Sequence, residues 1–270
     1  MAETASPPTA ELLGLRLHGE GLDDAAIAAW LADEEQGYAE LVGEVGEDGG
    51  TGEANRFHAF RFLDDRKFDC CLALGAASGR EYAPLEGRVG RFVAIEPGGR
   101  FWRPTIAGAP AEYRAPTARG TIDLPDGSCD LAGSFGVLHH IPNVSEVLCE
   151  LARVLKPGGL LLIREPVSSL GDFRRPRPGL TRNERGIPPA LMDRMLAEAG
   201  FAVRVRRFVD FPGGDTMARR LGLARPWDNG WFVRLDHAVS RLMAWNARYW
   251  RPRLIDKLAP RAAYWVAERT

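Results

Sequence analysis

Residues 128–166 read SCDLAGSFGVLHHIPNVSEVLCELARVLKPGGLLLIREP. The apolar runs at 128–138 and 159–166 have the length of strands, and the second is so apolar that we expect both of its faces to be buried. Between them, apolar residues recur at helical spacing until Pro157-Gly158-Gly159 ends the pattern. This stretch predicts a strand–helix–strand unit.

Strand and helix patterns alternate along the rest of the chain as well. Short apolar runs predict strands at 67–75, 91–97, 201–209 and 262–269, and apolar spacing predicts helices at 25–46, 56–63 and 189–200. Alternation of this kind is typical of an α/β fold with a mostly parallel sheet.

Composition limits the class of protein. The chain has 270 residues, of which 45% are hydrophobic and 26% charged, and no apolar run approaches the roughly 20 residues that cross a bilayer. The opening MAETASPPTA has neither the basic start nor the apolar centre of a signal peptide, and the four cysteines show no metal or disulfide spacing. We therefore expect a cytoplasmic protein with reduced, buried thiols and no metal.

Charge is divided unevenly along the chain. Residues 1–163 hold 14 Lys and Arg against 25 Asp and Glu, whereas residues 164–270 hold 21 against 11. The basic second half either meets an acidic group, such as a phosphate, a carboxylate or an anionic membrane surface, or neutralises the first half across the fold. The sequence leaves these two interpretations level.

A small-residue turn, GAASG at 75–79, follows the strand expected at 67–75. Such a turn lets a ligand approach the main chain, and a helix start after it offers unpaired N–H groups. Glu96 lies 21 residues beyond Gly75, at the carboxyl end of the next expected strand. Its carboxylate is either an exposed charge or an acceptor for both hydroxyls of a ribose. We favour the ribose role because the turn precedes Glu96 at the right offset.

The run from Cys70 to Pro166 resembles the class I S-adenosylmethionine-dependent methyltransferases, in particular the broad type that includes quinone-biosynthesis enzymes. CLALGAASG, VAIEP, DLPDGSCDLAGSFGVLHHIPN and LARVLKPGGLLLIREP follow one another in the order of that family. The resemblance implies a Rossmann-like fold with a mostly parallel, seven-stranded sheet, flanked by helices and carrying helical insertions. It also implies S-adenosylmethionine as the cofactor.

The resemblance also implies which residues hold the cofactor. The glycine turn and the acidic residue after the second strand contact the methionine and the ribose, the segment after 128–133 lies beside the methionine, and adenine lies near the residues before Leu124. The predicted cofactor-binding residues are Gly75, Ala77, Gly79, Glu96, Ile122, Asp123, Ser134, Phe135 and Gly136.

The chain departs from the family pattern in this region. The first loop of the family commonly reads Asp-x-Gly-x-Gly-x-Gly, whereas here Ala73 replaces the acid and Ala77 the central glycine. Gly120 and Thr121 stand where the family has an acidic residue. The lost carboxylate and the added methyl group make a degenerate cofactor site one of the alternatives.

Histidine suits the proton removal that methylation of a hydroxyl requires. His139 and His140 follow the strand at 128–138, at the edge where open α/β sheets bind ligands. Either is a candidate base, although the HHIP sequence also occurs in the family as a structural turn. Glu165, at the end of 159–166, is a third catalytic candidate, with an ion pair to Arg164 as its alternative.

The loop at 171–188, GDFRRPRPGLTRNERGIP, is unusually basic. Its arginines are arranged either as a fork for phosphate or carboxylate groups, with Glu184 holding one of them, or as a solvated loop. We expect a substrate lid because the loop lies beside the ligand edge. The predicted substrate-binding residues are Arg164, Arg174, Arg175, Arg182 and Arg185.

Four segments follow from these patterns. We expect a tail and helical cap at 1–66, a methyltransferase core at 67–208, a helical and aromatic insertion at 209–261 and a terminal core strand at 262–270. The insertion is basic and amphipathic, so it packs as a cap on the core or, less favoured, contacts a membrane surface. Nucleic-acid binding is disfavoured, because the net charge is −1 and no known module is present.

Together these features predict an S-adenosylmethionine-dependent methyltransferase that acts on a small or lipid-linked acceptor. The basic half of the chain favours O-methylation of an acidic or glycan-type substrate. C-methylation of a quinone-like ring and a non-catalytic S-adenosylmethionine-binding protein are the alternatives. A nicotinamide-dependent oxidoreductase is disfavoured by the LHHIPN and LKPGG segments and by the lack of a Tyr-x-x-x-Lys pair.

Overall fold

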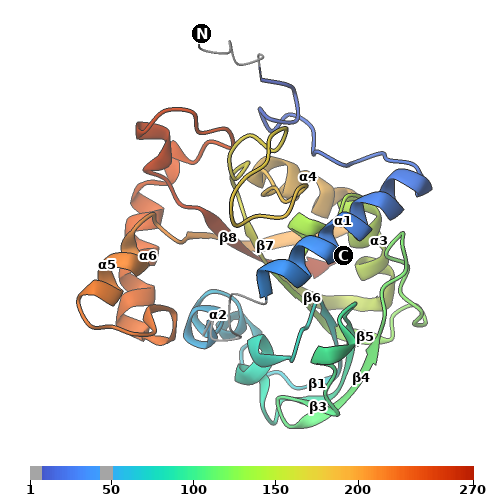
Figure 1. Cartoon of the computed structure of the whole chain (residues 1–270). Coiled ribbons are helices and arrows are strands. Elements are labelled where there is room, and N and C mark those ends of the chain that lie inside the picture. Colours follow the sequence, from blue (N-terminus) through green and yellow to red (C-terminus); the bar gives the residue numbers. More distant parts are fainter. Residues whose placement is uncertain (1–7, 43–50) are drawn as a thin grey trace.

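The computed structural model describes residues 8–42 and 51–270. Its centre is one sheet of eight strands in the order β3-β4-β2-β1-β5-β6-β8-β7 (Figure 1). The strands are β1 (Phe68–Leu74), β2 (Val89–Ile95), β3 (Thr105–Ile106), β4 (Ala109–Arg114), β5 (Cys129–Phe135), β6 (Leu155–Pro166), β7 (Phe201–Val209) and β8 (Ala262–Arg269). The pairs β1–β2, β1–β5, β2–β4 and β5–β6 are parallel, which confirms the predicted Rossmann-like α/β fold.

The helices include six α-helices and several short 3₁₀ turns in the described part of the chain. The α-helices are α1 (Asp24–Val42), α2 (Gly52–His58), α3 (Val144–Val154), α4 (Pro189–Glu198), α5 (Gly214–Arg220) and α6 (Gly230–Leu242). The 3₁₀ turns are η1 (Phe60–Leu63), η2 (Arg80–Leu85), η3 (Gly99–Phe101), η4 (Leu138–His140), η5 (Pro226–Asp228), η6 (Ala244–Asn246) and η7 (Ile255–Lys257). The last four residues of the helix predicted at 25–46 lie outside the described residues.

The sheet has one strand more than predicted. β3 and β4 form a short antiparallel hairpin, and β4 then pairs in parallel with β2. β4 lies near the edge of the sheet, carries Pro110 and is only partly buried, so it lacks the apolar run by which the other strands were predicted. The predicted helix at 56–63 is also interrupted, because α2 ends at His58 and η1 begins at Phe60.

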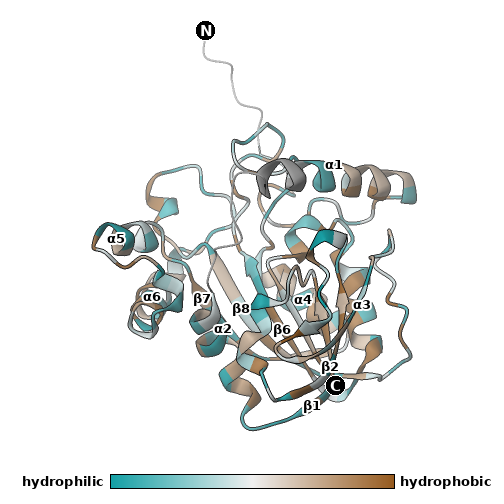
Figure 2. Ribbon diagram, turned by 60° about the horizontal axis from the view of Figure 1, so that its bottom comes forward, coloured by the Kyte–Doolittle hydropathy of each residue, from teal (hydrophilic) through white to brown (hydrophobic). Residues whose placement is uncertain are grey.

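The two faces of the sheet bury separate cores. Alternate side chains of a strand point to opposite faces, so Leu72 and Leu74 pack on the side of α3 and α4, whereas Cys71 and Ala73 pack on the side of η1 and η2. Burial of every residue of β1 except Asp69 explains why this strand reads as a continuous apolar run. Hydrophobic residues are accordingly concentrated in the central strands and in α3 (Figure 2).

Two segments flank the carboxyl edge of the parallel strands. α1 reaches the turn after β5, where Trp30 Nε1 donates a hydrogen bond to the main-chain oxygen of His140 (2.8 Å). α5 and α6 lie together at one side of the molecule, next to β7, in both ribbon views. None of the helices in the described residues is both long and apolar enough to span a membrane.

Candidate active site

The chain reverses direction across the sheet between β1 and β5. From β1 it runs to β2 and β4 on one side, and β5 and β6 then pair on the other side. Open α/β sheets bind ligands in the crevice that such a switch point leaves at the carboxyl ends of the strands. The predicted cofactor residues Gly75, Glu96 and Ser134 follow or end three of these strands, so the topology brings them to one place.

The turn after β1 adopts the left-handed backbone at three positions. Gly75 has a φ of 59°, Ala77 of 41° and Gly79 of 80°. A Cβ atom on Gly75 would lie 2.3 Å from Val137 Cγ2, and one on Gly79 would lie 2.5 Å from Ile106 Cγ1. Both glycines are therefore required by close packing as well as by backbone conformation.

Ala77 takes a conformation that costs an L-residue about 1–2 kcal/mol. Its N–H donates to Glu96 Oε2 at 2.8 Å, and its carbonyl oxygen accepts a hydrogen bond from the Tyr113 hydroxyl at 2.8 Å. These two bonds hold the turn in place without the glycine that the family pattern has here.

Glu96 is buried and already engaged on both oxygens. Oε1 accepts a bond from the Gly98 N–H (2.9 Å), and Oε2 accepts the Ala77 bond. Each carboxylate oxygen has two lone pairs, so one acceptor site on each oxygen is still open, which suits the two adjacent hydroxyls of a ribose.

Ser134 supplies a second indication of a polar ligand. Its side chain is fully buried, and among the described residues its Oγ has no hydrogen-bond partner. Ser134 pairs in register with Leu74, the residue before the glycine turn. An orphaned hydroxyl on the strand next to the glycine turn fits the polar methionine group of S-adenosylmethionine.

The other predicted cofactor residues lie around this position with different exposures. Ile122 is buried, with its N–H bonded to Glu150, whereas the Asp123 side chain is fully exposed and lies 3.8 Å from Arg114 Nη1. Phe135 packs into the core, and Gly136, with a φ of 76°, lines a neighbouring pocket. Their contacts to adenine and methionine stay predictions.

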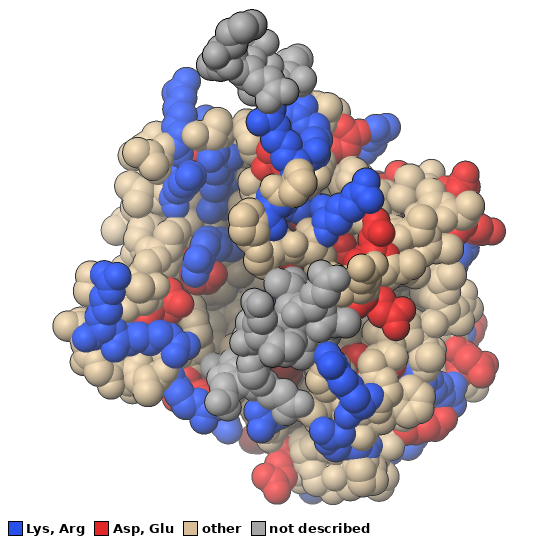
Figure 3. Space-filling view, viewed as in Figure 1, with Lys and Arg blue, Asp and Glu red and all other residues tan. Residues whose placement is uncertain are grey.

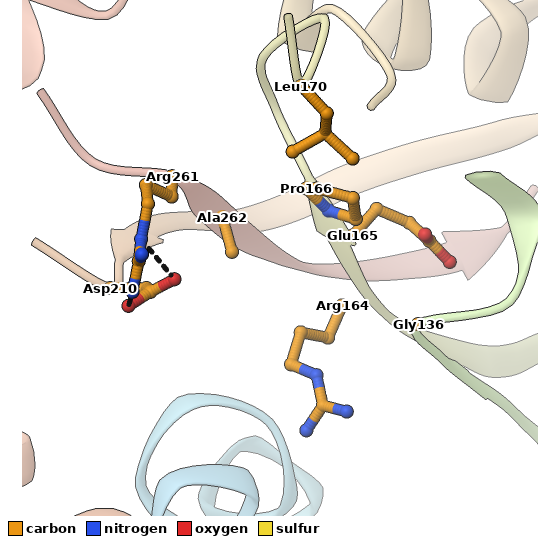
Figure 4. A pocket seen from close by; sticks show the side chains of 8 residues that line it. All are labelled: Gly136, Arg164, Glu165, Pro166, Leu170, Asp210, Arg261 and Ala262. Atoms are coloured by element: carbon orange, nitrogen blue, oxygen red, sulfur yellow. Dashed lines mark hydrogen bonds and ion pairs between the residues drawn. The ribbon is translucent and has the colours of Figure 1, made fainter. Parts of the chain in front are cut away.

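The pocket next to Gly136 has a volume of about 370 Å³ and lies over the ends of β5, β6 and β7 and the start of β8 (Figure 4). On one side of it Arg261 forms a two-bonded ion pair with Asp210, with distances of 2.6 and 2.9 Å. Arg164 points away from Glu165 toward α2. The residues that line the pocket are Gly136, Arg164, Glu165, Pro166, Leu170, Asp210, Arg261 and Ala262.

Arg164 is tied into a polar network that the sequence does not predict. Its side chain is 20% exposed and donates to Glu81 Oε1 (2.9 Å) and to Asn55 Oδ1 (3.2 Å), and Asn55 also accepts a bond from the Tyr264 hydroxyl (2.7 Å). Burial alone would lower the pKa of Arg164, but the Glu81 carboxylate raises it overall, so the guanidinium stays charged. Because Asn55, Glu81 and Tyr264 lie on three separate elements, no local sequence signal marks them.

Glu165 is an anchor for the turn that carries the two histidines. Its carboxylate is fully buried and accepts bonds from the N–H groups of Val137 (3.0 Å) and Leu138 (2.9 Å) and from His139 Nδ1 (2.7 Å). Burial favours a raised pKa for Glu165, but the contact with His139 and these donors lower it overall. This geometry gives Glu165 a positioning role, in contrast to its predicted role as a base or acceptor ligand.

His139 is held as a neutral imidazole. Burial lowers its pKa, and His140 lowers it further, against the opposite effect of Glu165. Since Nδ1 donates its proton to Glu165, Nε2 carries the free lone pair. His139 Cε1 lies 3.8 Å from the point that a Cβ on Gly136 would occupy, and Arg164 Nη2 lies 3.7 Å from the same point. His139 is therefore a neighbour of the pocket.

His140 has its own carboxylate partner. Its Nδ1 lies 2.7 Å from Glu34 Oε2 on α1, and the Thr181 hydroxyl donates to the same oxygen (2.6 Å). The two imidazole rings lie 4.0 Å apart between centroids. The structure thus brings the predicted pair together but separates their anchors, Glu165 for one and Glu34 for the other.

The predicted arginine fork in the loop at 171–188 does not form. Arg185 is fully buried beneath the histidine turn and donates to the main-chain oxygens of Leu138, His139 and Ile141 at 2.8–3.2 Å. Its guanidinium is buried and bonded to main-chain carbonyls of the protein, so it is not accessible to a substrate. The predicted substrate-binding role of Arg185 is therefore wrong.

The remaining arginines of the loop are dispersed. Arg174 pairs with Asp172 within the loop (2.7 Å), Arg175 is exposed, and Arg182, which is 80% exposed, lies 3.4 Å from Asp33 on α1. Arg177 donates to several carbonyls of the loop, among them that of Arg182 (3.2 Å). None of the four lines the pocket of Figure 4, so their substrate contacts stay predictions.

Comparison with known proteins identifies the region that carries this site. Residues 72–163 match the protein family described as "Methyltransferase domain". A probable S-adenosylmethionine-dependent methyltransferase of Mycolicibacterium smegmatis is 31% identical over 103 residues, which cover 37% of this chain and 40% of that protein. Residues 72–163 thus match a methyltransferase domain, and the cofactor of such domains, S-adenosylmethionine, is the one predicted from the sequence.

Two further similarities concern the fold and the share of each protein that is covered. An S-adenosylmethionine-dependent methyltransferase from Mesorhizobium loti has the same fold, with a TM-score of 0.52, 16% identity, and coverage of 83% of this chain and 100% of that one. An uncharacterised 37.1 kDa protein of transposon TN4556 from Streptomyces fradiae is 30% identical over 159 residues, 52% of this chain and 46% of that protein. The chain thus spans less than half the length of the curated relatives it matches. The quinone-biosynthesis subtype and the four predicted segments stay predictions.

Proposed function

We propose that this protein transfers the methyl group of S-adenosylmethionine to an oxygen atom of a small acceptor held in the pocket beside Gly136. The observation that carries the proposal is the division of one sheet edge into two halves. Gly75, Glu96 and Ser134 form a cofactor half over the ends of β1, β2 and β5, and the pocket forms an acceptor half that begins at Gly136 and extends over β6 and β8. Gly136 directly follows the cofactor segment of β5 and also lines the pocket.

The cofactor supplies an electrophilic methyl group, and the protein must align the acceptor with it. Glu96 would fix the ribose, while the glycine turn leaves its main chain accessible to the rest of the cofactor. On the other side, Arg164 and the pair of Arg261 with Asp210 bound the pocket with rigid polar groups. These groups are held by their own partners, so they position an acceptor without first being ordered.

The pocket favours a hydroxyl-bearing acceptor over a strongly anionic one. Both guanidinium groups that line it, Arg164 and Arg261, are already paired with a carboxylate. They therefore offer N–H donors rather than unbalanced positive charge. Of the acidic and glycan-type acceptors that the sequence suggests, we propose the glycan-type. An oxygen acceptor must also lose a proton, and His139 is the predicted base that lies next to Gly136 of the pocket.

Incubation with S-adenosylmethionine carrying a ¹³C methyl group and a panel of hydroxyl-bearing glycans and phenols tests the proposal. We expect label in a methyl ether, and the Glu96→Gln variant loses this transfer. The Glu112→Gln variant, whose carboxylate is exposed on β4, is the matched control and keeps it. Label on carbon would replace O-methylation by C-methylation, and cofactor binding without transfer to any acceptor would favour the non-catalytic alternative.

A further inference from the structure

His139, His140 and Glu184 bring one ligand atom each to within 4.8 Å of the others. His139 and His140 belong to the turn after β5, and Glu184 belongs to the basic loop at 171–188. Two imidazoles and one carboxylate are a common ligand set for a divalent transition-metal ion with open positions. The sequence spacing does not predict the set, because Glu184 comes from a distant loop.

One contact in this cluster places two ligand atoms at the spacing of a metal site. His139 Nε2 lies 3.7 Å from Glu184 Oε1, beyond hydrogen-bond distance. Because His139 donates its Nδ1 proton to Glu165, Nε2 presents a lone pair to a carboxylate oxygen. Two ligand atoms of a tetrahedral zinc ion with bonds of about 2.0–2.1 Å lie about 3.4 Å apart, close to the distance observed.

The surroundings of both histidines match the outer shell of a metal site. A metal-binding histidine usually donates its second ring N–H to a carboxylate, which fixes the tautomer and the ring orientation. Here Glu165 engages Nδ1 of His139 at 2.7 Å, and Glu34 engages Nδ1 of His140 at 2.7 Å. The two Nε2 atoms are thereby left as ligand atoms.

Glu184 is positioned by a separate contact. Its Oε2 accepts a bond from the Thr181 N–H at 3.1 Å, which leaves Oε1 toward His139. Arg177 and Arg185 are the nearby positive charges, and they donate to main-chain carbonyls, including that of Glu184 itself. Three carboxylates, those of Glu34, Glu165 and Glu184, thus converge on two imidazoles, with two guanidinium groups nearby.

We propose that His139, His140 and Glu184 bind one divalent transition-metal ion, with Zn²⁺ or Co²⁺ as suitable probes, beside the acceptor pocket. In a consequence that rests on the proposed function, the ion takes the acceptor hydroxyl as a further ligand and favours loss of its proton to water. The oxygen then forms a bond to the methyl carbon as the carbon–sulfur bond breaks, and S-adenosylhomocysteine leaves. The histidines act as ligands in this scheme and not as the base.

Titration of the chelator-treated full chain with Co²⁺ tests the site without any acceptor. We expect one Co²⁺ per chain with a visible absorption band that Zn²⁺ abolishes. Glu184→Gln removes a ligand and should weaken binding at least tenfold, and Glu34→Gln removes an outer-shell partner and should weaken it about 10–100-fold. Glu35→Gln, on the exposed side of α1, is the matched control and should bind as the native chain does.

S-Adenosylhomocysteine binding, measured on the same samples, shows that each variant is folded. No stoichiometric Co²⁺ binding by the native chain, or native affinity in both Glu184→Gln and Glu34→Gln, would overturn the metal site. S-Adenosylhomocysteine would bind through Glu96, which is not a ligand of the proposed metal site. Binding of S-adenosylhomocysteine without binding of Co²⁺ would therefore refute the metal site alone. Co²⁺ binding without nucleoside binding refutes the proposed function alone.

Discussion

At the scale of single residues, Ala77 shows how this chain tolerates a departure from the family pattern. The left-handed conformation at this position is suited to glycine, and the chain stabilises alanine there with one hydrogen bond on each side of the residue. Because one of the two partners is Glu96, the turn and the carboxylate predicted to bind the ribose form a single unit. The departure at Ala77 thus leaves the cofactor half intact.

Ala77→Gly should stabilise the protein by about 0.5–1 kcal/mol. Removal of the backbone strain should raise the free energy of unfolding by about 1–2 kcal/mol. The greater conformational entropy of glycine in the unfolded chain should lower it by roughly 0.4–1 kcal/mol. Ala218→Gly, in the helix α5, should instead destabilise by about 1 kcal/mol. Denaturant unfolding measures both changes, and destabilisation by Ala77→Gly would show that its backbone is not left-handed.

His58 is a buried base without a hydrogen-bond partner on either ring nitrogen among the described residues. Its ring stacks on Tyr264. The nearby side chains of His237, Arg207 and Arg61 would repel a positive charge on His58. Burial, together with these neighbours, lowers its pKa from 6.5 to about 3. The folded protein therefore keeps His58 neutral where the unfolded chain protonates it.

Stability should fall as the pH drops from 6.5 toward 3, because the unfolded state binds the extra proton over that window. At pH 5 the loss from this one group is about 2 kcal/mol. His58→Phe keeps the ring stacked on Tyr264 and removes the titration, so its advantage over the native chain should grow by about that amount between pH 7 and pH 5. Parallel pH profiles of unfolding free energy for the two proteins would contradict this assignment.

At the scale of elements, arginines of the second half of the chain stabilise loops by binding main-chain carbonyls. Arg185 holds the histidine turn, Arg177 holds the loop at 171–188, and Arg251 donates to the carbonyls of Ala259 (3.1 Å) and Pro260 (2.7 Å). Part of the positive charge that suggested an acidic ligand is therefore structural. The basic loop contacts both the histidine turn and α1, and its role as a substrate lid stays a prediction.

Arg185→Met should destabilise the protein by about 3–5 kcal/mol, because it leaves three buried carbonyl groups of the turn without donors. Arg182→Met, in the same loop but exposed, should change stability by less than about 0.5 kcal/mol. Thermal and denaturant unfolding of the two variants compares them directly. Equal effects would mean that Arg185 does not support the turn.

The central strands are predicted well because their pattern is set by burial, and β7 is also predicted at its observed bounds although it is only partly buried. β1, β5, β6 and β8 were predicted within a few residues, because strands buried on both faces read as continuous apolar runs. β3 and β4 were missed, since they are short or half-exposed. The positions of Glu96 and the histidine pair were predictable from strand ends, whereas the roles of Glu165 and Arg185 depend on which main-chain groups fold back onto them.

At the scale of the whole molecule, the charges of the chain are sorted to different sides. Lys and Arg side chains gather where α5, α6 and the following loops lie, and acidic side chains are more frequent on the opposite side (Figure 3). The carboxyl edge of the sheet lies between these regions and joins the cofactor half to the acceptor half. We infer that the cofactor half, with Glu96 as its polar centre, binds S-adenosylmethionine.

Calorimetric titration of the native chain with S-adenosylmethionine and S-adenosylhomocysteine tests this claim most directly. We predict micromolar binding, which corresponds to roughly 8 kcal/mol, and a loss of about 1.5–3 kcal/mol in Glu96→Gln, with Glu112→Gln unchanged. A folded native chain that binds neither compound, or a Glu96→Gln variant that binds both as tightly as the native chain, would contradict the account.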